Sequence, residues 1–154
     1  MRILGSISNF AQDEGHIFQL RQGGEHPGIL LIHLWSKDSQ AKYFPGSHLI
    51  PLDSVRVANR MWEVPPAALE QAGIVGEEKL FTDGGLAILN ARLALEMPHG
   101  SPVTCGFVVR DDLTDIEKEL KRWPRMVLPK SAVQMVAELQ SEKMGVHFTI
   151  KDET

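Results

Sequence analysis

The sequence predicts an α/β or α+β fold, in which helices pack on a mixed β-sheet within a single globular domain, residues 1–154. Three observations lead to this prediction. The chain has 154 residues, of which 43% are hydrophobic and 23% are charged, as in an ordinary single domain. The apolar run Ile29–Trp35, which only His33 interrupts, is typical of a strand buried on both faces. Predicted strands and helices then alternate over residues 28–123, as they do when helices cover a partly parallel sheet.

The N-terminal part, residues 1–27, is predicted to be a β-hairpin. Arg2–Ser8 and His16–Gln22 both have strand character, and a polar loop containing Gln12–Gly15 separates them. This pair lies outside the alternation of the core. We therefore expect it to extend the sheet in antiparallel fashion or to mediate pairing with a second copy.

Residues 28–123 are predicted to form the α/β core. A proline in the first turn and a glycine at the end favour a short helix from Pro65 to Gly73. The Ala- and Leu-rich stretch Leu86–Met97 is predicted to be a helix, although the Asp83-Gly84 turn before it is also typical of a hairpin. The remaining elements of the core are a strand over Lys79–Thr82, a strand over Pro102–Arg110 and a helix opened by a Thr114-x-x-Glu117 capping box and stopped by Pro124.

The C-terminal part, residues 129–151, is predicted to contain a helix and a strand. Ser131-x-x-Gln134 matches a capping box, and Val133, Val136 and Leu139 then recur at helical spacing. Apolar and polar residues alternate from Val146 to Lys151, as in a strand with one buried face.

Composition excludes several classes of partner and site. The net charge of −4 and the pI of about 5.8 argue against nucleic acid, and no apolar run reaches the ~20 residues of a membrane helix. Cys105 is the only cysteine, so the chain cannot form an internal disulfide or a cysteine-based zinc site. The six histidines show no short metal-binding spacing, so we expect neither a metal nor a cofactor. These features favour a cytoplasmic protein.

The best candidate ligand site is the segment Thr82-Asp83-Gly84-Gly85. It follows a predicted strand and opens a predicted helix, where free backbone N–H groups and the helix dipole favour an anion. The alternative is that Asp83 only caps the helix and the glycines only make the turn. His33 interrupts a buried strand, so its ring is either a satisfied core group or a functional one. His48 is the second candidate histidine, and a site could still assemble in space from His33, His48 and a carboxylate such as Asp53.

One segment resembles a known family. Leu31-Ile32-His33-Leu34-Trp35 followed by Tyr43-Phe44-Pro45-Gly46-Ser47-His48-Leu49-Ile50-Pro51-Leu52 resembles a rhodanese domain, with its best local match over Phe44–Leu52. The family carries a catalytic cysteine after its next strand, whereas this chain has Thr82 or Asp83 there. The resemblance therefore implies a domain without sulfurtransferase activity.

Three functions remain open, and the sequence identifies no catalytic residue set. The first is a non-catalytic module that binds a protein or a small ligand and forms a homodimer. The second is a small hydrolase or transferase that uses His33 or His48 with Asp83. The third is an accessory subunit of a larger assembly, which would expose an apolar patch around Met135 and Met144.

Overall fold

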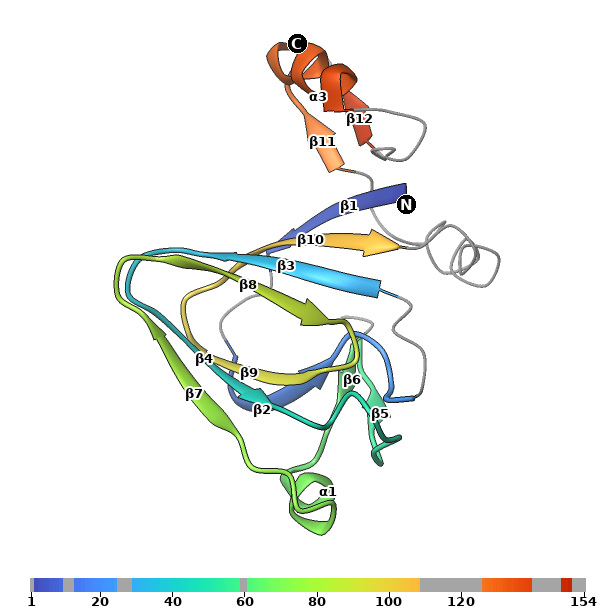
Figure 1. Ribbon diagram of the computed structural model, residues 1–154, viewed down its shortest axis with the longest axis vertical. Coiled ribbons are helices and arrows are strands. Elements are labelled where there is room, and N and C mark those ends of the chain that lie inside the picture. Colours follow the sequence, from blue (N-terminus) through green and yellow to red (C-terminus); the bar gives the residue numbers. More distant parts are fainter. Residues whose placement is uncertain are drawn as a thin grey trace.

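Figure 1 shows the computed structural model of the chain, which describes residues 2–9, 13–24, 29–58, 61–108, 126–139 and 148–150. Within these residues the regular structure is mostly β: the strands form three sheets and the helices are short. β-Sheet is present as predicted, but the predicted mixed, partly parallel sheet is wrong, because the strands of both larger sheets pair in antiparallel fashion. The helical layer that the sequence predicts over the sheet is not found among the described residues, and the helix predicted after Thr114 lies outside them.

A four-stranded sheet forms one layer of the molecule, and all its neighbouring strands are antiparallel. The middle strands β10 and β3 are in register, with Cys105 opposite Ile32 and Thr104 opposite His33. In spatial order the strands are β1 (Arg2–Asn9), β10 (Val103–Val108), β3 (Ile29–Trp35) and β8 (Gly85–Asn90).

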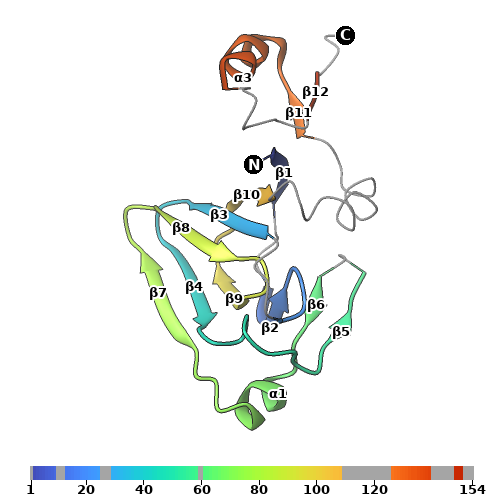
Figure 2. The same cartoon turned by 45° about the vertical axis from the view of Figure 1, so that its right-hand side comes forward.

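A six-stranded antiparallel sheet forms the second layer. Figure 2 shows β2, β9, β4 and β7 of this sheet beneath the four-stranded sheet. In spatial order its strands are β5 (Val55–Arg56), β6 (Trp62–Glu63), β2 (Asp13–Gln19), β9 (Ala94–His99), β4 (Ser39–Phe44) and β7 (Glu77–Phe81).

Several short connections carry the chain from one sheet to the other. The residues between β3 and β4, between β7 and β8, and between β9 and β10 each join a strand of one sheet to a strand of the other. The inner faces of the two sheets therefore share one core, as in sandwich packing. Its buried residues come from β3, β4, β8, β9 and the β8–β9 turn: Ile29, Leu31, Trp35, Ala41, Tyr43, Leu89, Ala91, Leu95 and Met97.

A second apolar cluster lies where the helix α1 (Pro66–Gln71) covers one end of the six-stranded sheet. Pro66 opens this helix, and Gly73 follows its end with φ of +67°, so the predicted helix from Pro65 to Gly73 is confirmed. Leu69 is the buried residue of the helix, and it packs with Ile17, Phe44, Leu52, Val64 and Ala94.

The C-terminal helix and strand are also confirmed in part. The 3₁₀ turn η2 (Lys130–Ala132) leads into α3 (Val133–Leu139), and β12 (Phe148–Ile150) pairs in parallel with β11 (Met126–Leu128). The capping box predicted at Ser131 is not formed, because the helical turn already begins after Pro129, and that position carries no side-chain cap. Val136 is buried, as its helical spacing predicts.

The predicted N-terminal hairpin is wrong. β1 and β2 lie next to each other along the chain, but β1 pairs with β10 and β2 pairs with β6 and β9. The two strands therefore belong to different sheets. Non-local pairing overrides the local hairpin pattern here, because β10 offers β1 a complete antiparallel partner.

The predicted helix over Leu86–Met97 is also wrong, since β8 and β9 occupy this stretch. A turn separates the strands: the backbone N–H of Arg92 donates to the side-chain oxygen of Asn90 at 3.0 Å, and that of Leu93 donates to the Asn90 carbonyl at 2.9 Å. An asparagine that binds the backbone two residues on is typical of a turn rather than of a helix interior.

The expectation that β3 is buried on both faces is wrong as well. Its burial alternates strictly: Ile29, Leu31, His33 and Trp35 face the core, while Leu30 and Leu34 are exposed. Both faces are apolar in sequence, so periodicity alone cannot separate a strand buried on two faces from one buried on a single face.

Candidate functional site

The segment Thr82–Gly85, predicted to open a helix, is a tight corner between two strands. Phe81 ends β7, and β8 begins at Gly85, so no helix N-terminus lies here to attract an anion. Gly84 has φ of +79°, and a Cβ built on it would lie 2.9 Å from the Trp35 carbonyl oxygen. Thr82 and Asp83 are exposed to solvent. The glycines therefore only make the tight turn, which was the alternative interpretation of these two residues.

His33 is a core residue in the structure. Its side chain is almost fully buried, and its ring lies edge-on to Trp35 with centroids 5.8 Å apart. Neither ring nitrogen has a hydrogen-bond partner in the described part of the chain, and the same holds for the hydroxyl of its register partner Thr104. Burial lowers the pKa of His33 to about 4, so the ring is neutral at neutral pH.

His48 lies in the turn that follows β4, at the opposite end of this strand from the Thr82–Gly85 corner. The Ser39 end of β4 pairs with Phe81, whereas the Phe44 end leads to His48. Six strand residues separate the two places, which corresponds to roughly 17 Å. The proposed combination of His48 with Asp83 is therefore not assembled, and His33 faces the core rather than either place.

The segment that resembles a rhodanese domain has a structural role in this turn. Gly46 has φ of +94°, and the buried hydroxyl of Ser47 accepts the backbone N–H of Ala94 at 2.8 Å. Leu52 is buried in the cluster beneath α1. These contacts explain the residue types without reference to a family, and the resemblance stays a prediction.

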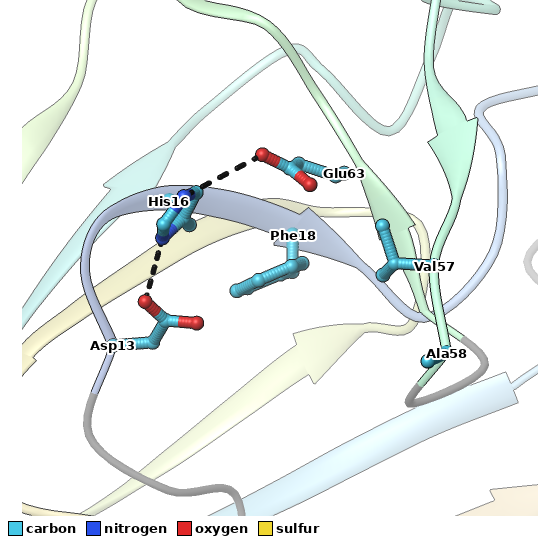
Figure 3. A pocket seen from close by; sticks show the side chains of 6 residues that line it. All are labelled: Asp13, His16, Phe18, Val57, Ala58 and Glu63. Carbon is cyan, nitrogen blue, oxygen red and sulfur yellow. Dashed lines mark hydrogen bonds and ion pairs between the residues drawn. The ribbon is translucent and has the colours of Figure 1, made fainter.

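A hollow that the sequence did not indicate lies beside β2 and β6 (Figure 3), on the face of the six-stranded sheet that also carries Leu95. It is open and has a volume of about 290 Å³. His16 is its central polar group: Nδ1 lies 2.7 Å from Asp13 Oδ1, and Nε2 lies 3.8 Å from Glu63 Oε1. The residues that line the hollow are Asp13, His16, Phe18, Val57, Ala58 and Glu63.

A bulge in β2 brings Asp13 and His16 together. In a regular strand, residues three apart point to opposite faces. Here the register against β9 shifts between Asp13 and Phe18, and Gly15 has φ of +86°. The N–H of Gly15 donates to Glu96 of β9 at 3.0 Å. The glycine two residues after Asp13 was the available signal, because glycine inside a strand often marks a bulge.

The two carboxylates act on the charge of His16. The hydrogen bond that His16 donates to Asp13 and the charge of Asp13 raise the pKa of His16, and Glu63 contributes a smaller increase. Phe18 and Val57 supply apolar walls beside these groups. The arrangement thus favours the protonated form of the imidazole, and the two carboxylates favour cations. No group of three His, Cys, Asp or Glu side chains within the described ranges is arranged to hold a metal ion.

The outer face of the four-stranded sheet is a second functional candidate. On β3, β8 and β10 the outward positions are apolar except Asn90 at the end of β8, and they lie in register across the strands. Leu86 is 58% exposed and Ile88 is 64% exposed, although both are large aliphatic side chains. We call this set the outer face; its residues are Leu30, Ile32, Leu34, Leu86, Ile88, Val103, Cys105 and Phe107.

Comparison with protein-family models finds no match for this chain, and comparison with curated proteins finds no relative. None of the helices in the described part of the chain is long and apolar enough to cross a membrane.

Proposed function

We propose that this chain is a non-catalytic module that binds a protein with an apolar surface through the outer face of its four-stranded sheet. The observation that carries the proposal is the set of eight apolar side chains on neighbouring strands, with no charged residue among them. Large contiguous apolar patches on a soluble domain are typical of protein interaction sites.

The two sides of the strands that carry the outer face support this proposal. A strand that serves only to close a core places polar residues on its solvent side. β3 and β8 instead carry leucine and isoleucine outward, as well as inward toward the core. Leaving these side chains in water contributes nothing to folding, so their presence is best explained by burial against a partner.

The thiol of Cys105 tests this function, because it lies in the middle of the outer face and is the only thiol of the chain. We expect a neutral thiol reagent to modify Cys105 in the folded chain once dilution has dissociated any bound protein. The rate is compared with that of the urea-unfolded chain. A thiol that stays protected at every dilution until the chain unfolds would mean that the chain itself covers this face, and the proposal would fail.

A second candidate function is the binding of a small organic cation in the hollow around His16. It is favoured by the two carboxylates beside apolar walls from Phe18 and Val57. An alkylammonium ion would place its charge against the carboxylate oxygens of Asp13 and Glu63 that do not face His16, and its chain on Phe18. We expect such an ion to shift the NMR signals of His16 in a saturable manner, and to shift them less in Asp13→Asn. Unchanged signals would exclude this function.

A further inference from the structure

The size and chemistry of the outer face, together with the neighbouring segment of the chain, indicate which molecule binds this face. We propose that it is a second copy of this chain, packed sheet against sheet to form a homodimer. This inference rests on the proposed function, because it identifies the protein that the outer face binds.

The size of the outer face fits a sheet better than a helix. The outer face spans β10, β3 and β8, and three strands of about six residues, spaced by about 4.8 Å, make a face of roughly 300 Å² in projection. A helix about 10 Å wide covers only two of these strands. A second four-stranded sheet covers all of them, at the separation of about 10 Å that is usual for packed sheets.

The chemistry of the outer face fits a copy of itself. A face that recognises a different protein usually combines apolar residues with polar groups that select the partner. The outward residues of β3 and β10 are all apolar or cysteine, and β8 adds only Asn90 at its end. Such a face is complementary to itself under a two-fold rotation, which is the symmetry of most homodimers.

The chain's own neighbouring segment is a poor alternative. Residues 109–125 join β10 to β11, and their sequence predicts a helix from Thr114 to Trp123. The segment starts beside Arg2, the register partner of Val108, and Figures 1 and 2 both show β11 next to the same end of β1. A helix of this length is about 15 Å long and about 10 Å wide, so it would cover only about half of the outer face.

The position of Cys105 specifies the geometry of the dimer. The centre of the sheet lies between β10 and β3, where Cys105 faces outward opposite Ile32. A two-fold axis through this centre brings the two Cys105 side chains near each other. Sheets about 10 Å apart leave the Cα atoms beyond the ~4.4–6.8 Å of a disulfide. We therefore expect a short bismaleimide, rather than direct oxidation, to link the two copies.

The experiment measures the solution mass by light scattering across a range of concentrations. We expect a dimer for the unmodified chain, and for Ile88→Lys a dissociation constant at least roughly a hundredfold higher, since a lysine would be buried without a partner. Leu80→Lys is the matched control, because Leu80 is 67% exposed on β7, outside the outer face, and its variant should remain a dimer. Circular dichroism confirms that both variants fold.

The outcomes separate this inference from the proposed function. A dimer that persists in Ile88→Lys would overturn the inference by placing the interface elsewhere. A monomeric chain with a reactive Cys105 would also overturn it, while leaving the outer face free for a different protein. A monomeric chain with a protected Cys105 would overturn both, because the chain would then cover its own outer face.

Discussion

The indole of Trp35 donates a hydrogen bond of 3.0 Å from Nε1 to the hydroxyl of Tyr43, and so joins β3 of one sheet to β4 of the other. Both side chains are buried, and the indole ring of Trp35 also stacks on Phe81, with ring centroids 5.2 Å apart. Burial raises the pKa of Tyr43 to about 12, and the bond from Trp35 opposes part of this increase. The tyrosine therefore stays a neutral hydroxyl, and the pair stabilises the contact between the sheets.

The Trp35–Tyr43 bond predicts a coupling between two substitutions. Tyr43→Phe leaves the indole N–H buried without an acceptor, so we expect a loss of about 1–2 kcal/mol in the free energy of unfolding. Trp35→Phe removes the donor and also some packing. The double variant should lose about 1 kcal/mol less in the free energy of unfolding than the sum of the two single losses. Urea unfolding of the unmodified chain and the three variants measures this difference. Strictly additive losses would show that the bond contributes nothing.

Buried His33 predicts a loss of stability in acid. Its pKa in the folded chain is about 4, below the ordinary value of 6.5, so between these values the unfolded chain binds a proton that the folded chain does not. Stability is fully present above pH 6.5 and falls as the pH drops toward 4. The expected loss is about 3 kcal/mol, since each pKa unit corresponds to ~1.4 kcal/mol.

The substitution His33→Leu isolates this contribution from the titration of carboxylates. We expect urea unfolding of His33→Leu to show a shallower pH dependence than that of the unmodified chain between pH 6.5 and 4. Replacement of exposed His99 by glutamine is the matched control and should retain the full slope. An unchanged slope in His33→Leu would mean that the buried ring is protonated or solvated in the folded chain.

The hollow predicts a graded response of the His16 titration. Asp13→Asn removes both the hydrogen-bonded carboxylate and its charge, so the pKa of His16 should fall toward its ordinary value. Glu63→Gln should lower it less, because the carboxylate oxygen of Glu63 is 3.8 Å from the ring. NMR titration of the His16 imidazole measures both effects. A larger effect of Glu63→Gln than of Asp13→Asn would contradict the geometry of the hollow.

The corner between β7 and β8 predicts a difference between two glycines. Both Gly84 and Gly46 have positive φ, which costs a non-glycine residue about 1–2 kcal/mol. A Cβ on Gly46 meets open space, whereas one on Gly84 lies 2.9 Å from the Trp35 carbonyl oxygen. Gly84→Ala should therefore lower the free energy of unfolding more than Gly46→Ala does, as measured by urea denaturation. Equal losses would show that backbone strain alone accounts for both.

Local signals in the sequence predicted those elements whose determinants lie within a few residues. The proline and glycine at the two ends of α1 placed this helix, and alternating or apolar runs placed β1, β3, β7 and β10. Leu86–Met97 was misassigned because alanine and leucine favour a helix, whereas pairing of β8 with β3 and the Asn90 turn decided the outcome. Propensity is a weak prior that tertiary pairing overrides.

The candidate site was harder to predict, because its members come together only in space. Asp13 and His16 are near in sequence, but a bulge at Gly15 was needed to place them on one side, and Glu63 arrives from β6. The outer face was not predicted for a different reason. The outward leucines of β3 made this strand resemble one that is buried on two faces.

The sequence by itself determined that this is a mildly acidic chain with an apolar strand at Ile29–Trp35, one thiol and no cysteine-based metal site. Only the tertiary structure decided which strands pair, that His33 is a neutral core group, and which of two apolar faces of β3 is buried. The physical reason is that hydrophobic burial is non-directional. An apolar side chain must leave water, but the partner that covers it is chosen by the non-local pairing of strands.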